Sequence, residues 1–299
     1  MRFLVSLLFA TSLSGLAAAD YDVLIVGGLV YDGTGAPPRQ AAVGIKGDKI
    51  ALVGEAGTST ATRTIDVKGK AVAPGFMDMH AHLDTLPRLP AGESAVRQGV
   101  TTGLGGPDGN GPWPMADHLQ EMERLPLGLN VAFLTGHNTI RLGVLKMADR
   151  SPAPSELKQM QEMVAQAMRE GAFGLSTGLK YLPGAFAQTD ELIALSAIAG
   201  QLGGFYASHL REEGTGLLPA VGEAIEIGRK ARIPIVITHH KAVGKPTWGA
   251  SVKTLALVDA ARAQGIDVMM DQYPLPSHST GTSHHKCLEM NPRHGRLRD

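Results

Sequence analysis

From Gly75 to Asp271, short apolar runs alternate with longer stretches of helical periodicity, and this alternation constrains the fold more than any other feature of the sequence. Apolar runs of this kind, separated by helices, are typical of parallel strands buried on both faces. The candidate strands are residues 75–82, 101–106, 130–136, 173–177, 204–209, 234–239 and 266–271. We therefore expect an α/β fold of the TIM-type (β/α)8 barrel class, incomplete because an eighth strand, needed to close the ring, is missing.

The segments between these strands carry helix signals. Ser155 and Thr189 are predicted N-caps for helices over 156–170 and 191–202. Further helices are expected over 221–231 and 252–263. Three methionines of the first helix lie on one apolar stripe and are predicted to be core residues rather than ligands: Met160, Met163 and Met168.

The regions flanking the barrel segment differ from it in pattern. Residues 1–19 combine Arg2, an apolar run and a small-residue end, which is typical of a signal peptide and predicts an exported protein, periplasmic or secreted. Residues 20–73 read as short β runs with glycine turns and are expected to form part of a small β-sandwich. The barrel is expected over 74–282, and 283–299 shows no periodicity, which predicts an unstructured or out-of-frame tail.

The charge and cysteine content exclude some classes of function. With 28 basic and 28 acidic residues, the chain has no net positive charge with which to bind a nucleic-acid backbone. No other apolar stretch approaches membrane-spanning length, so no membrane association is expected after signal cleavage. The single cysteine, Cys287, cannot form an internal disulfide, so stability must come from the core and from any bound metal.

Histidines recur at the carboxyl ends of the predicted strands. His80 and His82 end the first strand, two residues apart and so on the same side, while His209 and His239 close two later strands. Barrel enzymes keep their active sites at these strand ends, and imidazoles with a carboxylate bind zinc or similar divalent ions. Asp108, after the second strand, is the candidate carboxylate, although Pro-Asp-Gly can also be a plain turn. Such a site would activate water for attack on a carbonyl.

Other polar residues are weaker candidates. His137 ends the third predicted strand and can lie in the barrel mouth, whereas His240 should alternate away from His239. Lys241 returns to the His239 face and can bind a substrate anion. In the tail, His284, His285, Cys287 and His294 have suitable ligand chemistry, but no predicted element positions them.

Six segments of the chain together match the sequence of a known family, and they are residues 21–28, 72–82, 99–102, 171–179, 207–213 and 237–241. In these segments, which occur in the family's order, the chain resembles the metal-dependent amidohydrolase superfamily and, within it, the N-acyl-D-amino-acid deacylases, or D-aminoacylases. The resemblance implies a catalytic barrel that hydrolyses the amide bond of a small N-acyl amino acid. It also implies a β-sandwich built from both chain ends, of which this chain contains the N-terminal share.

The resemblance also implies roles for individual residues. His209 and His239 resemble the ligands of a tightly held zinc ion, and His80 and His82 resemble those of a weaker second metal. Asp108 stands where the family typically has a bridging cysteine, and this departure would change the metal preference or the metal affinity of the site. Three further residues resemble the family's positions that hold the substrate carboxylate: Lys241, Tyr273 and Ser279.

One family residue has no match in this chain. The family uses an aspartate at the end of strand eight as metal ligand and general base, so we expect these residues alone to have little or no deacylase activity. The alternatives are another amidohydrolase substrate, such as a dipeptide or cyclic amide, and a non-catalytic metal-binding fragment. The sequence leaves the oligomeric state open.

Overall fold

A computed structural model describes residues 18–273, 290–291 and 296–297, and the chain divides into two compact units, Met1–Pro74 and Gly75–Asp299. Most of the predicted signal peptide lies outside the described residues, as do Ser279 and the tail residues His284, His285, Cys287 and His294. Within the described residues, none of the helices combines the length and hydrophobicity that a bilayer span requires.

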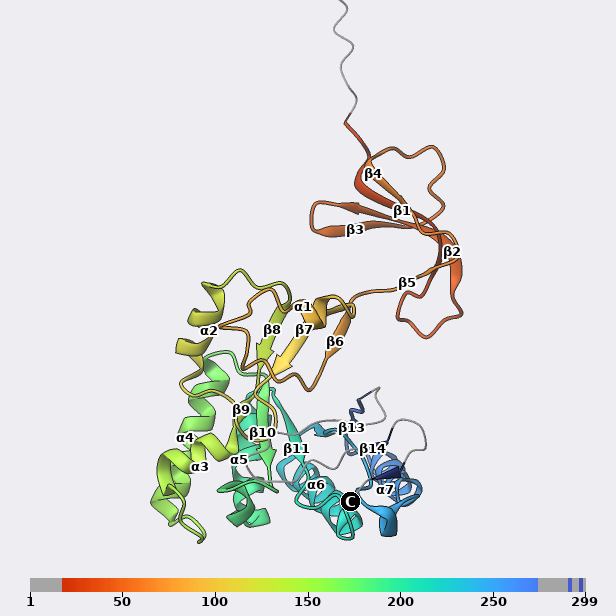
Figure 1. Cartoon of the computed structure of the whole chain (residues 1–299). Helices are drawn as coiled ribbons and strands as arrows, with labels where there is room; N and C mark the ends of the chain where they lie inside the picture. Colours follow the sequence, from red (N-terminus) through yellow and green to blue (C-terminus); the bar gives the residue numbers. More distant parts are fainter. Residues whose placement is uncertain (1–17, 274–289, 292–295, 298–299) are drawn as a thin grey trace, which may run out of the picture. The chain divides into compact units, whose positions relative to one another are not determined.

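The first unit contains a five-stranded sheet (Figure 1). Its strands are β1 (Tyr21–Val30), β2 (Arg39–Lys46), β3 (Lys49–Gly54), β4 (Ala61–Asp66) and β5 (Ala71–Val72). Strand β1 is central, pairing antiparallel with β2 and parallel with β4 and β5. Gly47, with φ 60°, makes the tight turn between β2 and β3, a conformation that glycine adopts without steric cost. This is a glycine turn of the kind predicted within residues 20–73.

The second unit is built on parallel strands at the seven predicted positions. They are β6 (Phe76–Asp78), β7 (Val100–Gly105), β8 (Asn130–Phe133), β9 (Thr135–Gly136), β10 (Gly174–Gly178), β11 (Phe205–His209), β12 (Ile235–Ile237) and β13 (Val268–Met270). The order is β6-β7-β8 in one sheet and β9-β10-β11-β12-β13 in the other. Strands β8 and β9 are successive pieces of one strand position, because the amide of Leu134 between them donates to the carbonyl of Gly105, 2.9 Å away.

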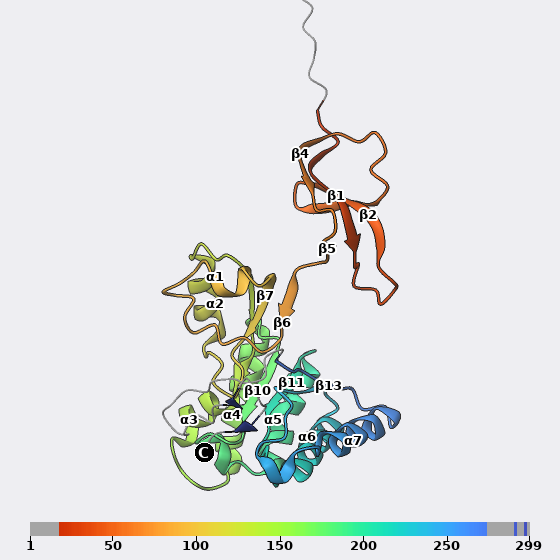
Figure 2. The same cartoon turned by 45° about the vertical axis from the view of Figure 1, so that its right-hand side comes forward.

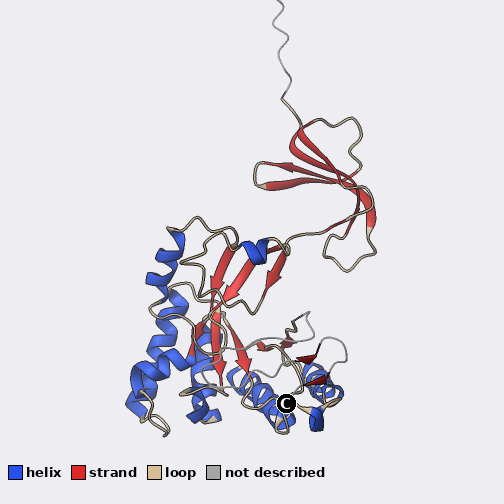
Figure 3. Ribbon diagram, viewed as in Figure 1, coloured by secondary structure: helices blue, strands red, loops and turns tan. Residues whose placement is uncertain are grey.

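Helices follow most of these strands, and the last five of them pack against one another in chain order. They are α1 (Glu93–Val96), α2 (Met115–Glu123), α3 (His137–Leu145), α4 (Pro154–Arg169), α5 (Thr189–Gln201), α6 (Leu217–Ala231) and α7 (Ser251–Ala263). Two short 3-10 turns are η1 (Gly184–Phe186) and η2 (Lys245–Thr247). Helices α6 and α7 lie side by side in both views (Figures 1 and 2), and Figure 3 shows the strands gathered inside the helical layer. This is the expected α/β barrel-type arrangement, and an eighth strand position is absent from the described residues.

Both predicted N-caps were wrong, and in each case the helix begins earlier. Helix α4 starts at Pro154 with Ala153 as N-cap, because proline at the first helical position already has the required φ. The Glu156 carboxylate accepts a hydrogen bond from the Ala153 amide at 2.7 Å and takes over the capping. Thr189 is the first residue of α5, and its hydroxyl donates to Glu223 at 2.8 Å instead of capping the helix.

The core has two layers that follow the alternation of strand side chains. In β12, Ile235 and Ile237 pack into the cluster shared with helices α3 to α7. Val236, between them, packs inside the strand layer with Ala207 of β11 and Leu104 of β7. Met160 is fully buried in the helical cluster, and Met163 and Met168 pack against it, so the predicted core role of these methionines is confirmed.

Part of the last segment is paired where the sequence predicted no element. Strands β14 (Met290–Asn291) and β15 (Arg296–Leu297) form a two-stranded antiparallel ladder within 283–299. The two strands are two residues each, which is too short for hydrophobic periodicity to reveal.

Candidate metal centre

The five predicted metal-binding side chains come together at the carboxyl ends of four strands. His80 and His82 follow β6, Asp108 lies in the turn after β7, His209 is the last residue of β11, and His239 follows β12 by two residues. Asp108 and His209 are buried, and the His80 and His239 side chains are each 13% exposed. His82, at 61%, is the most exposed member.

Asp108 lies between two pairs of histidines. Its Oδ2 atom is 3.6 Å from His80 Nε2 and 3.5 Å from His82 Nε2. Its Oδ1 atom is 3.5 Å from His209 Nδ1 and 3.4 Å from His239 Nε2. Each oxygen of the single carboxylate therefore faces its own pair of imidazole nitrogens, which makes two potential metal-binding groups that share Asp108.

These separations suit two ligands of one ion better than a hydrogen bond. An N–H···O hydrogen bond spans about 2.7–3.2 Å, whereas two tetrahedral zinc ligands with bonds of about 2.0–2.1 Å are about 3.3 Å apart. Two buried atoms that face each other across this space, Asp108 Oδ1 and His209 Nδ1, have no hydrogen-bond partner among the described residues. Unsatisfied buried polar atoms are costly, so this donor set fits a divalent cation.

The directions of the Asp108 and His239 side chains depend on an unusual backbone conformation as well as on strand alternation. By alternation, His239 would share the face of Ile235 and Ile237, which pack against the helices. Its φ of 37° instead turns the chain, and the Asp271 carboxylate accepts a hydrogen bond from the His239 amide. Asp108 has a φ of 57°. Left-handed conformations at residues other than glycine cost energy and are enriched at functional sites.

Glu213, which the sequence analysis did not single out, contacts the outer nitrogens of two of the histidines. Its Oε1 atom lies 3.0 Å from His239 Nδ1, and its Oε2 atom lies 3.7 Å from His209 Nε2. Glu213 lies four residues after His209 in the loop between β11 and α6. A carboxylate on the far side of a ligating imidazole fixes the orientation of the ring.

The local charges are strongly coupled. Burial alone would raise the pKa of Asp108, but the surrounding histidines outweigh burial and hold it well below its usual range. For His239, burial lowers the pKa, but contacts with Asp108 and Glu213 outweigh it and raise the pKa to about 9. Burial lowers the pKa of His209. The two carboxylates, Asp108 and Glu213, thus favour the charged form of the His239 imidazole between them.

The predicted substrate-binding residues have different placements. Lys241 adjoins the cluster, since its Nζ atom is 2.7 Å from His239 Nδ1 and donates to Glu213 Oε1 at 2.5 Å. Burial, with a contribution from the charge of Glu213, raises the pKa of Tyr273. A further aromatic residue, Tyr181, was missed: its ring lies 4.7 Å from the His209 ring, and burial raises its pKa to about 12.

Two weaker histidine candidates lie outside the cluster. His137 begins α3 and is fully buried, with Nε2 2.8 Å from Glu191, so it does not line the barrel mouth. His240 points away from His239, as expected, and its Nε2 atom lies 2.8 Å from the Thr254 hydroxyl of α7.

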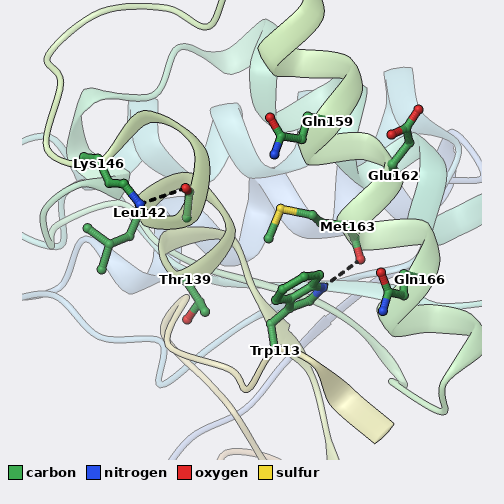
Figure 4. A pocket seen from close by; sticks show the side chains of 9 residues that line it. Trp113, Thr139, Leu142, Lys146, Gln159, Glu162, Met163 and Gln166 are labelled. Carbon is green, nitrogen blue, oxygen red and sulfur yellow. Dashed lines mark hydrogen bonds between the residues drawn. The ribbon is translucent and has the colours of Figure 1, made fainter. Parts of the chain in front are cut away.

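A surface pocket of about 550 Å³ lies elsewhere in the second unit (Figure 4). Trp113, Leu142 and Met163 line it together with polar side chains of α3 and α4, and the Trp113 indole donates to the Met163 carbonyl at 3.3 Å. None of its lining residues belongs to the histidine cluster.

Comparisons with known proteins identify relatives of this chain. The chain is 37% identical over 284 residues to a D-aminoacylase of Alcaligenes xylosoxydans xylosoxydans, which covers 87% of this chain and 58% of the relative. It is 38% identical over 282 residues to an N-acyl-D-glutamate deacylase of the same organism, again with 87% and 58% coverage. The chain thus spans less than two thirds of the length of these curated relatives.

A solved structure is similar over the same region. The N-acyl-D-glutamate deacylase from Bordetella bronchiseptica, complexed with zinc and a phosphonate inhibitor, superposes with a TM-score of 0.81 at 36% identity, covering 86% of this chain and 59% of that one. The model of the amidohydrolase family matches residues 63–242, which include all five histidine and aspartate residues of the cluster. The chain therefore belongs to the amidohydrolase family.

Proposed function

We propose that this chain is the metal-binding part of a zinc-dependent hydrolase that removes the acyl group from N-acyl-D-amino acids. The observation that carries the proposal is the position of Asp108, whose two oxygens each lie 3.4–3.6 Å from a separate pair of histidine nitrogens. Zinc in the similar deacylase and the 37–38% identity to D-specific deacylases support the metal and the substrate class.

The ligands would be His209, His239 and one oxygen of Asp108 at the first position, and His80, His82 and the other oxygen at the second. Bound divalent ions would supply polarisation of the amide carbonyl and activation of water. Glu213 would hold the rings of His209 and His239 in place from behind.

Two side chains at the cluster would act on the substrate. Tyr181 keeps its proton at neutral pH, since its pKa is raised to about 12, and would donate a hydrogen bond to a substrate oxygen. Lys241 donates to Glu213 and to the His239 carbonyl, at 2.5 and 3.0 Å, and would supply the positive charge that attracts the substrate carboxylate. We propose that the hydroxyls of Tyr273 and Ser279 also donate hydrogen bonds to the substrate carboxylate. Ser279 lies outside the described residues.

A substrate panel tests this proposal. Zinc-loaded chain would be assayed with N-acetyl-D- and N-acetyl-L-amino acids, dipeptides and cyclic amides, with Asp108→Asn as the matched variant. Because no residue of this chain matches the family's strand-eight aspartate, the proposal predicts only slow hydrolysis, confined to the D-N-acyl compounds and lost in the variant. Preference for dipeptides or cyclic amides would favour another amidohydrolase activity, and zinc binding without turnover would favour a non-catalytic metal-binding fragment.

We propose that residues 1–19 direct export, on the basis of the apolar run after Arg2 and the small residues at its end. Expression of the chain in a bacterium, fractionation and N-terminal sequencing test this. Cleavage near Ala19 in an extracytoplasmic fraction supports export, and an intact N-terminus in the cytosol contradicts it.

A further inference from the structure

Ser176 is a fully buried polar residue inside the strand layer, in the middle of β10. Its neighbours in the strand face the other way: Leu175 packs into the helical core cluster, and Thr177 contacts the Tyr206 hydroxyl at 2.8 Å. A hydroxyl in this interior needs hydrogen-bond partners, because an unpaired one would be costly. Ser176 has two close partners in the turn that carries Asp108, and a third, longer contact of 3.5 Å to the Thr135 carbonyl of β9.

The Ser176 hydroxyl ties together the two sides of that turn. It donates to the carbonyl of Gly106 at 2.6 Å and accepts from the amide of Gly109 at 3.1 Å. These two residues flank Asp108, and one side chain therefore closes the segment 106–109 on itself. Sixty-seven residues separate Ser176 from Gly109, so the contact also anchors the turn to a distant strand.

The turn lies directly on the backbone of the neighbouring strands. A Cβ atom added at Gly178 would lie 2.1 Å from the Asp108 carbonyl oxygen, and one added at Gly136 would lie 2.3 Å from the Gly109 carbonyl oxygen. Only glycine fits at such distances. The ends of β9 and β10 therefore form a seat for the turn, with Ser176 as its hydrogen-bonding side chain.

The conformation held in this seat is a costly one. Gly106, Asp108 and Gly109 all have positive φ, at 71°, 57° and 78°. A left-handed aspartate persists only where its surroundings determine the conformation. Without the Ser176 hydroxyl, the Gly106 carbonyl and the Gly109 amide would each lose a partner, and the turn would be free to relax.

We propose that Ser176 is the positioning residue that fixes the Asp108 carboxylate between the two histidine pairs and thereby sets the metal affinity of the centre. The inference rests on the proposed function, in which Asp108 is shared by two ions. Ser176 itself binds neither metal nor substrate and acts through the turn 106–109.

The test compares Ser176→Ala with Thr177→Val, titrating each metal-free protein with Co²⁺ by calorimetry and recording the visible spectrum of bound Co²⁺. Thr177 is the matched control because it is the next residue of the strand, is equally buried and bonds through its hydroxyl to Tyr206 and Ser208 instead. We expect Co²⁺ affinity to fall about 10- to 100-fold in Ser176→Ala, with an altered spectrum, and to stay within about twofold in Thr177→Val.

A second variant covers the case in which Ser176→Ala does not fold. Ser176→Cys keeps a side chain with one atom beyond Cβ and a weak donor, so we expect an intermediate loss of affinity. If both Ser176 variants keep the wild-type Co²⁺ affinity and spectrum, the positioning role of Ser176 is wrong, while the proposed function is unaffected. Wild-type chain that binds no Co²⁺ would contradict the proposed function, and this inference with it.

Discussion

Glu213 Oε1 lies 3.0 Å from His239 Nδ1, on the opposite side of the imidazole ring from Asp108, which is 3.4 Å from Nε2. His209 is enclosed in the same way, with Asp108 near Nδ1 and Glu213 near Nε2. Two carboxylates thus enclose two histidines, one on the side where a metal would bind and one behind. Each ring is held in an orientation that presents one nitrogen to the cluster.

Glu213→Gln should weaken metal binding without removing a ligand. The variant keeps the shape of the side chain but removes the charge that strengthens its contacts with the two imidazoles. We expect zinc affinity to fall about 10- to 100-fold, measured by competition with a chelating dye. Glu226→Gln is the control, because within the described part of the chain Glu226 pairs only with Arg229 and Lys230 on α6. Equal affinities in the two variants would contradict the role of Glu213.

Metal binding should release a proton at neutral pH. In the metal-free protein, contacts with Asp108 and Glu213 outweigh burial and raise the pKa of His239 to about 9, so this imidazole is charged at pH 7.5. A ligand must be neutral, and protons therefore compete with the metal below pH 9. Apparent affinity should rise with pH up to about 9 and level off above it. Zinc calorimetry in two buffers of different ionisation enthalpy measures the release, and identical heats would contradict it.

A second buried charge cluster should matter for stability and not for metal binding. Glu191 lies 2.8 Å from His137 and 2.5 Å from Arg141, and all three side chains are at most 2% exposed. Removing one partner of a buried pair costs about 3–5 kcal/mol, so Glu191→Gln should lower the free energy of unfolding by roughly that amount. The exposed pair of Lys158 and Glu162 provides the control, since Glu162→Gln should cost less than about 1 kcal/mol.

The same cluster predicts a direction of pH dependence. Burial raises the pKa of Glu191, but His137 and Arg141 outweigh burial and lower it overall. A carboxylate with a depressed folded-state pKa contributes stability above its unfolded pKa and loses it as the pH falls through the folded value. Urea unfolding between pH 7 and pH 3 should therefore show a steeper loss for wild type than for Glu191→Gln. Parallel curves would contradict this account.

The sequence was sufficient to locate the strands and the five residues of the cluster, for a physical reason. Parallel strands bring their carboxyl ends to one edge, so histidines at strand ends must meet there. Strand alternation alone does not predict the direction of the His239 side chain. It would place this side chain on the helix-facing side of the strand, whereas the φ of 37° turns it toward the cluster. Local dihedral angles of this kind depend on tertiary contacts, here with Asp271.

The residues that support the cluster were not predictable from one sequence. Glu213 follows Glu212, and no pattern distinguishes the buried carboxylate from its more exposed neighbour. Ser176 and Tyr181 act through partners far away in the chain. The two N-cap predictions were wrong for a local reason. Pro154 and Thr189 each occupy the first helical position, so the N-cap is the residue before each of them.

The central claim is that the two oxygens of Asp108 serve two separate metal positions. The most direct test is a crystal structure of the chain grown with Zn²⁺, with anomalous data collected on both sides of the zinc edge. The account predicts one anomalous peak among Asp108 Oδ1, His209 and His239, and a second among Asp108 Oδ2, His80 and His82. A well-ordered cluster with neither peak at saturating Zn²⁺ would contradict it.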